Sequence, residues 1–91
     1  MVESGDQRGL YIPRVWALPH GFKIYTRQLA PMQMKARHGE DYDGIWDLDT
    51  MTIDIKKSLS RERKWYVYSH ELMHAINDWQ HWLINQGIAV G

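Results

Sequence analysis

The sequence contains no cysteine. Disulfide scaffolds and thiolate zinc sites are therefore excluded, and any bound metal must take its ligands from His, Asp or Glu. The formal net charge is zero, so no bulk electrostatic field draws the chain to nucleic acid or anionic lipid. No apolar run approaches the length needed to span a bilayer. The first residues, MVESGDQRGL, lack the basic and apolar regions of a signal peptide, so a cytoplasmic protein is expected.

Bulky aromatic side chains are plentiful, with five Trp and five Tyr in 91 residues. The chain is 44% hydrophobic and 24% charged, which is the composition of an ordinary globular protein. This length fits a single domain over residues 1–91, with one core. Residues 1–9 are polar and contain glycine, and we expect them to be flexible.

Charged residues are unevenly distributed along the chain. Residues 40–54 carry six acidic side chains and no Lys or Arg, whereas residues 56–64 carry five basic side chains against Glu62 alone. Two solvated surfaces are the simpler interpretation of this pattern. The alternative is a basic patch that docks a partner.

Alternation and turn residues predict a small antiparallel sheet. Two prolines in LYIPRVWALPHG indicate an extended or turning segment. Residues 22–29 alternate Phe22, Ile24 and Thr26 with more polar neighbours and predict a strand. Residues 32–37 fit either a short helix or a loop. Residues 45–48 and 51–55 predict a tight hairpin that turns at the dipeptide DT.

A long helix is predicted from Arg61 to about Ile84, with Ser60 as its N-cap and Gly87 as its stop. Its apolar residues repeat at helical spacing and define a core face, while His and Asp gather on the opposite face. The expected fold class is therefore α+β, with a small antiparallel sheet packed on one long helix. The core face comprises Trp65, Tyr68, Leu72, Ile76, Trp79 and Leu83, and the opposite face carries His70, His74, Asp78 and His81.

The centre of this helix reads His70-Glu71-x-x-His74. Residues four apart share a helix face, so two imidazoles can reach one metal at ~2.0–2.1 Å. Glu71 lies about 100° round the helix, where it can take a proton from a zinc-bound water. The sequence predicts a Zn²⁺ site with His70 and His74 as ligands and Glu71 as general base. Two solvated histidines on a surface helix are the plain alternative.

Residues 44–78 resemble the active-site segment of the zincin metallopeptidases. The minimal ImmA/IrrE-like peptidases of phages and mobile elements, and the mitochondrial inner-membrane processing peptidase group, are the most similar kinds. In these families a strand similar to GIWDLDTMTIDI precedes a helix similar to SHELMHAIND. The resemblance implies that His70 and His74 bind zinc and that Glu71 is the base. It also implies that the strand borders the cleft and pairs with an extended substrate.

A third protein ligand is not given by the motif. No Glu follows Glu71, which departs from one zincin pattern, and Gln80 stands where another pattern has its third His. His81 is the first candidate, provided that the helix ends near Asn77, because an unbroken helix separates His70 and His81 by ~16 Å along its axis. Two imidazoles sharing a metal span ~12–13 Å at most. Asp78 is the runner-up, followed by His20, which we expect in a turn, His38, which we expect to be solvated, and the acidic residues of 40–49.

We therefore expect a zinc-dependent metallopeptidase that hydrolyses peptide bonds of a peptide or protein substrate. No nucleic acid and no membrane partner is expected. Because the chain is short, a homo-oligomer or larger assembly is expected to complete the cleft. One alternative is a non-catalytic zinc-stabilised module that acts through a partner protein and fills all four metal positions with protein ligands. Another is a zincin fold that binds no metal.

Overall fold

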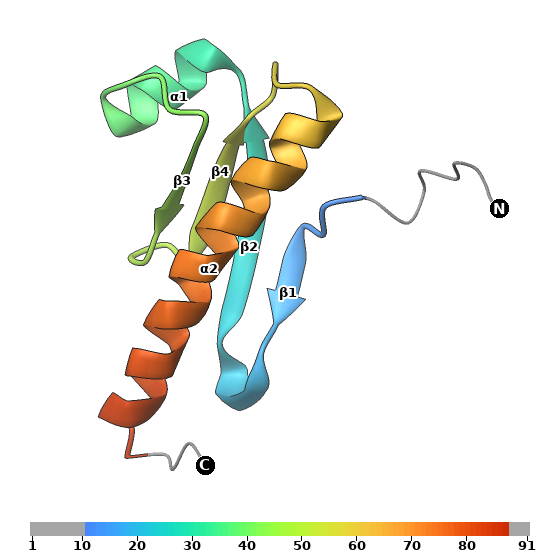
Figure 1. Cartoon of the computed structure of the whole chain (residues 1–91). Coiled ribbons are helices and arrows are strands. Elements are labelled where there is room, and N and C mark those ends of the chain that lie inside the picture. The colour runs from blue at the N-terminus through green and yellow to red at the C-terminus, as the bar shows by residue number, and fades with distance from the viewer. Residues whose placement is uncertain (1–10, 88–91) are drawn as a thin grey trace, which may run out of the picture.

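The computed structural model describes residues 11–87. A sheet and two α-helices make up this part of the chain, which confirms the expected α+β class (Figure 1). The segment 1–9, expected to be flexible, lies outside the described residues. The elements in chain order are β1 (Val15–Ala17), a 3-10 turn η2 (Pro19–Gly21), β2 (Lys23–Leu29), α1 (Pro31–His38), β3 (Gly44–Asp47), β4 (Thr52–Lys56) and α2 (Arg61–Asn85).

The sheet is mixed, so the prediction of an antiparallel sheet is wrong. Its strand order is β1-β2-β4-β3. Two pairs are antiparallel, but β2 pairs with β4 in parallel, with Thr26 opposite Ile53. The physical reason is the connection through α1, which carries the chain across one end of the sheet (Figure 1). As a result β3 is not adjacent to β2. After the hairpin turn, β4 lies between β2 and β3 and runs parallel to β2.

The predicted hairpin is present with shifted bounds. The strands are β3 and β4, and Leu48–Met51 forms a turn longer than the expected dipeptide. The carboxylate of Asp47 accepts from the backbone N–H of Asp49 at 3.0 Å, a local bond that favours a turn. Met51 closes the turn with a left-handed φ of 52°.

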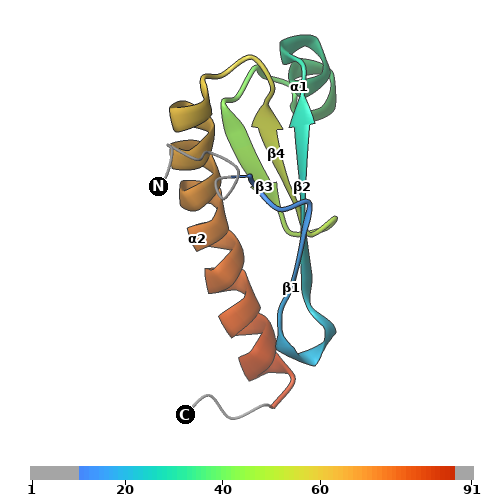
Figure 2. The same cartoon turned by 90° about the vertical axis from the view of Figure 1, so that its right-hand side faces the viewer.

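Helix α2 covers one face of the sheet along its whole length (Figures 1 and 2). The predicted cap is confirmed, because the Ser60 hydroxyl accepts from the backbone N–H of Arg63 at 3.2 Å. Gly87 follows the last turn with a φ of 75°, as expected of a helix stop. Between helix and sheet lies a core of buried side chains: Phe22, Ile24, Ile53, Ile55, Val67, Tyr68 and Ala75.

The predicted core face of α2 is largely confirmed. Tyr68 and Leu83 are buried, and Trp65, Leu72 and Trp79 are partly buried against the core. Val67, which is 5% exposed, was not predicted to be buried, whereas Ala75, which the zincin resemblance implies as a packing residue, is 0% exposed. Small side chains at these positions let the helix axis approach the sheet.

Helix α1 lies at one end of the sheet, on the side away from α2 (Figure 2). Pro31 begins it, as expected of a residue without an N–H to satisfy. Gly39 ends it with a φ of 83°, donating its N–H to the Lys35 carbonyl at 2.8 Å. Within residues 11–87, neither this helix nor any other is both long and apolar enough to cross a membrane.

Candidate metal centre

His70 and His74 lie side by side on the exposed face of α2. Their Nε2 atoms are 3.3 Å apart, and the two rings meet edge to face at 84°. Two nitrogens bound to one tetrahedral zinc at ~2.0–2.1 Å are themselves separated by about 3.3–3.4 Å. One ring can donate a hydrogen bond to the other at this separation, and the same separation is compatible with a shared zinc. This is the observation by which the pair fits a metal.

Glu71 lies on the side of α2 that faces β3. A Cβ added at Gly44 would come within 3.5 Å of the Glu71 Cγ, and it would collide with the Cγ1 of Val67. Gly44 therefore lets the start of β3 approach α2 at the turn that carries Glu71. A lone glycine at a strand position is a sequence signal for such a close approach, but the contact of Gly44 with α2 was not predicted.

A shallow depression of about 230 Å³ opens beside this turn. His70 and Glu71 form one side of it, and the first residues of the hairpin form the other. Arg63 and Tyr66 close its end, with the Arg63 guanidinium 5.0 Å from the centre of the Tyr66 ring. The side chains of His70 and Glu71 are thus accessible to a ligand from solvent.

Charged side chains link the hairpin to α2 at the rim of the depression. The Arg63 guanidinium donates to the Asp43 carboxylate at 3.1 Å, and the Lys56 ammonium lies 3.2 Å from both Asp41 and Asp43. Hydrogen bonds from Arg63 and then Lys56 lower the pKa of Asp43, and hydrogen bonds to Asp41 and Asp43 raise the pKa of Lys56. The acidic and basic segments are therefore partly paired with each other, rather than forming two independent solvated surfaces.

The outer edge of β3 carries backbone groups that face away from the sheet. Lys56 donates its N–H to the Asp43 carbonyl at 2.8 Å. This bond shows which residues of β3 bond to β4 in the antiparallel ladder. In such a ladder alternate residues bond to the partner strand. The N–H and C=O groups of Gly44 and Trp46 therefore point outward, and no strand among residues 11–87 pairs with them.

The structure does not bring His81 to the histidine pair. Helix α2 runs without a break from Arg61 to Asn85, so the turn near Asn77 on which His81 depended does not form. In this continuous helix His70 and His81 are ~16 Å apart along the axis. That separation exceeds the reach of two imidazoles on one metal.

Asp78 takes another partner. Its carboxylate accepts from the indole N–H of Trp46 at 2.7 Å, so it is directed at β3 rather than along the helix to His74. The prediction that Asp78 shares the solvent face with the histidines is wrong, because the side chain is half-buried in this contact. Strand β3 therefore contacts α2 beside the candidate site at two residues, Gly44 and Trp46.

The more distant candidates lie elsewhere in the fold. His20 has a φ of 67° in the turn η2, as expected of a turn residue. His38 was expected to be solvated, and that is wrong: its side chain is 9% exposed and its Nε2 lies 2.8 Å from the Asp54 carboxylate. Asp54 is 1% exposed and also binds Arg27 and Arg37, on the face of the sheet away from α2. This buried cluster was not predicted.

Across residues 11–87, no three His, Asp or Glu side chains come together as metal ligands would. If a metal binds here, His70 and His74 would supply two ligands, and the part of the chain that the structure describes holds no third one. A closed structural zinc site needs four protein ligands. The two-histidine arrangement fits such a site poorly and leaves positions open.

Comparison with known proteins identifies no relative: the chain matches no protein-family model, no curated protein and no solved structure.

Proposed function

We propose that the protein is a zinc-dependent peptidase in which His70 and His74 hold the metal and Glu71 is the general base. The observation that carries the proposal is that the two Nε2 atoms lie 3.3 Å apart on one face of α2, a separation compatible with two nitrogens on one tetrahedral zinc. The resemblance of residues 44–78 to the zincins supports the same assignment. We assign only these two ligands. A third ligand would come from residues outside 11–87, from the substrate or from a second molecule.

When bound, zinc supplies a Lewis acid that lowers the pKa of water and polarises a scissile carbonyl. The chain's own residues supply the rest. Glu71 takes the proton from the attacking water as its oxygen bonds to the carbonyl carbon. The carbon–nitrogen bond then breaks, and Glu71 returns the proton to the leaving amine. Gly44 lets the start of β3 lie against the turn that carries Glu71.

The outer edge of β3 is where we place the substrate. An extended peptide can pair with the outward N–H and C=O groups of Gly44 and Trp46 by strand addition. This edge borders the depression that His70 and Glu71 line. A peptide bound there runs past the base, and it needs no deep pocket to be held.

The test combines metal analysis with peptide cleavage. Wild type is expected to bind one zinc per chain and to cleave members of a mixed peptide library, as followed by mass spectrometry. His70→Ala and His74→Ala are expected to lose the zinc. Glu71→Gln is expected to keep the zinc and lose turnover by about 10²–10⁴-fold, because it cannot carry the proton.

His81→Ala is the matched control, since it removes an exposed histidine from the same helix. It is expected to keep both zinc and cleavage. Loss of zinc in this variant would return His81 to the ligand set and overturn the assignment drawn from the unbroken helix. Zinc binding without cleavage in wild type would instead favour a module that acts through a partner.

A further inference from the structure

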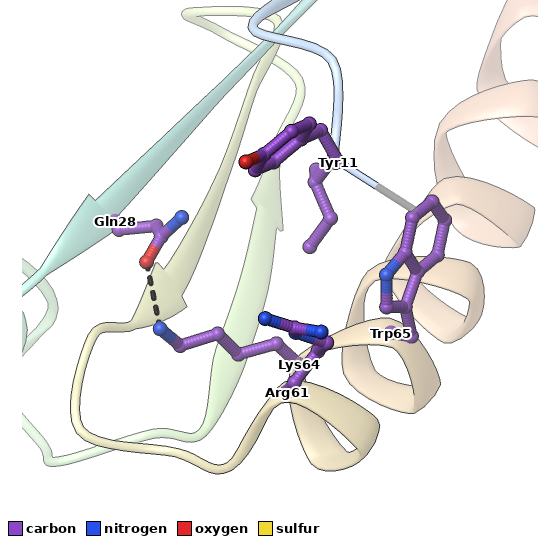
Figure 3. A pocket seen from close by; sticks show the side chains of 6 residues that line it. Tyr11, Gln28, Arg61, Lys64 and Trp65 are labelled. Carbon is purple, nitrogen blue, oxygen red and sulfur yellow. Dashed lines mark hydrogen bonds between the residues drawn. The ribbon is translucent and has the colours of Figure 1, made fainter. Parts of the chain in front are cut away.

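A second concave surface lies on the other side of α2 from the histidine pair. Two adjoining cavities, of about 330 and 760 Å³, share Tyr11, Ile12 and Gln28 as a common wall. One is closed by the first turn of α2 and the other by the end of β2 and Lys57. We call the two together the basic groove. Figure 3 shows the smaller cavity, with Tyr11 and Trp65 on its walls.

Basic side chains line this groove from three segments of the chain. Lys64 and Arg61 extend side by side into it from α2, where the Lys64 ammonium donates to the Gln28 side chain at 2.9 Å (Figure 3). Neither makes an ion pair with any of residues 11–87. No Asp or Glu is among the lining residues, whose cations are Arg14, Arg27, Lys57, Arg61 and Lys64.

Arg61 and Lys64 occupy an unfavourable position in the first turn of α2, which Glu62 in the same turn offsets in part. Positive charges in the first turn of a helix oppose its dipole, and like charges three residues apart repel each other. Arg61 and Lys64 carry both costs. An anionic ligand in the groove would offset both the unfavourable interaction with the helix dipole and the repulsion between the two cations. The basic segment 56–64 thus divides in two, because Lys56 and Arg63 pair with acidic residues of the hairpin while Lys57, Arg61 and Lys64 face the groove.

The groove also contains backbone and side-chain polar groups that have no hydrogen-bond partner among residues 11–87. Strand β1 stops pairing with β2 where the Arg14 carbonyl accepts from the Thr26 N–H at 2.9 Å. Two residues further, the N–H and C=O of Gln28 face the same open edge, since alternate residues of β2 bond to β4. The hydroxyl of Thr26, a groove residue only 9% exposed, has no hydrogen-bond partner within the described chain. Buried polar atoms of this kind normally have one.

We propose that the basic groove binds an extended acidic peptide segment of a partner protein. Its carboxylates meet Arg61, Lys64 and Lys57, and its backbone pairs with Gln28 at the open edge of β2. A peptide fits better than a nucleic acid for two reasons. The open strand edge offers backbone donors and acceptors that a peptide matches. The chain as a whole is neutral, so a long polyanion gains no attraction beyond the groove.

The proposal does not depend on zinc or on Glu71, so its test is a binding measurement. The probe is a fluorescent peptide of about ten residues that alternates Glu and Thr, compared with one that alternates Gln and Thr. Fluorescence anisotropy is expected to show binding of the acidic peptide only. The double variant Arg61→Gln, Lys64→Gln is expected to raise its dissociation constant at least about tenfold, because charge-assisted hydrogen bonds are lost.

The matched control is Lys23→Gln, which removes an exposed lysine from β2 outside the groove. It is expected to bind the acidic peptide like wild type. Slower hydrogen exchange at the Gln28 amide in the complex is expected from strand addition. Circular dichroism checks that each variant is folded.

Three outcomes would overturn the proposal. A single-stranded oligonucleotide of similar length that binds more tightly than the acidic peptide would assign the groove to nucleic acid. Equal weakening by Lys23→Gln would show that general charge, rather than the groove, attracts the peptide. An acidic peptide that binds no better than the Gln–Thr peptide, or that does not bind at all, would remove the charge complementarity on which the proposal rests.

Discussion

Asp54 is the most completely buried acidic side chain in the described part of the molecule, at 1% exposure. Its two oxygens accept from the Arg27 guanidinium at 2.9 and 3.1 Å. One of them also lies 2.8 Å from His38 Nε2 and 3.4 Å from Arg37 Nε. One carboxylate thereby ties β4, β2 and the last turn of α1 together. It stabilises the end of the sheet at which the chain crosses to β3.

Asp54→Asn is therefore expected to lower the free energy of unfolding by about 2–4 kcal/mol. The amide carries no charge and cannot accept from all three partners, which leaves polar groups of Arg27 and His38 unsatisfied. Urea unfolding measures the effect. Asp49→Asn, at an exposed turn carboxylate that makes no ion pair within residues 11–87, is the control and is expected to change little. Equal small losses in both variants would show that the cluster is not stabilising.

The contacts of the candidate site and of the Asp54 cluster could be predicted from the sequence to different extents. His70, Glu71 and His74 follow from helical spacing alone, because four residues make about one turn. His38 and Asp54 are separated by 16 residues. They meet only through the placement of α1 on the sheet, which no local pattern encodes. The same holds for Trp46 and Asp78, which are 32 residues apart.

At the scale of elements, the contact between β3 and α2 decides how near the open edge of β3, the proposed substrate edge, lies to Glu71. Gly44→Ala is expected to lower the free energy of unfolding by about 1–3 kcal/mol, because the new methyl group overlaps the Val67 side chain. The φ of Gly44 is outside the left-handed region, so the cost comes from packing. Thermal or urea unfolding measures it.

The control for this change is a double-mutant cycle with Val67→Ala, which removes the overlapping atom. The double variant is expected to lose less stability than the sum of the two single variants, since the methyl group then has room. Additive losses would mean that α2 and β3 are not in the close contact described. Peptide cleavage is expected to fall in Gly44→Ala and to recover partly in the double variant.

The elements themselves were predicted unequally. The bounds of α2 follow from one capping serine and a long apolar period, which are local signals. The parallel pairing of β2 with β4 was missed because strand direction depends on the path of the connection, and the alternation of a strand is the same in both directions. Val67 was missed because a small side chain gives a weak signal in an apolar period.

For the whole molecule, pH dependence follows from the ion pairs between the hairpin and α2. The pKa of Asp43 is lowered from its ordinary 3.8, chiefly by Arg63. Its contribution to stability is therefore present above that value and is lost as the pH falls through the lowered pKa. The pKa of Lys56 is raised from 10.5, chiefly by Asp41. Its contribution is present below 10.5 and is lost as the pH rises through the raised value.

Asp43→Asn is accordingly expected to be less stable than wild type near neutral pH, and equal to it in strong acid. The difference is expected to be small and to shrink in high salt, because these side chains are partly exposed. Urea unfolding of both proteins over a series of pH values measures it. A difference that persists unchanged well below pH 3.8 would show that Asp43 acts by something other than its charge.

The open edge of β3 has a further consequence, for the protein in concentrated solution. Unpaired strand edges invite edge-to-edge aggregation between identical molecules. This edge is four residues long and is bounded by Asp43 and Asp47. If two copies aligned in antiparallel fashion so that Gly44 of one paired with Trp46 of the other, Asp43 would face Asp47 at both ends, and like charges placed so are unfavourable. The acidic side chains that flank this edge thus disfavour its self-association.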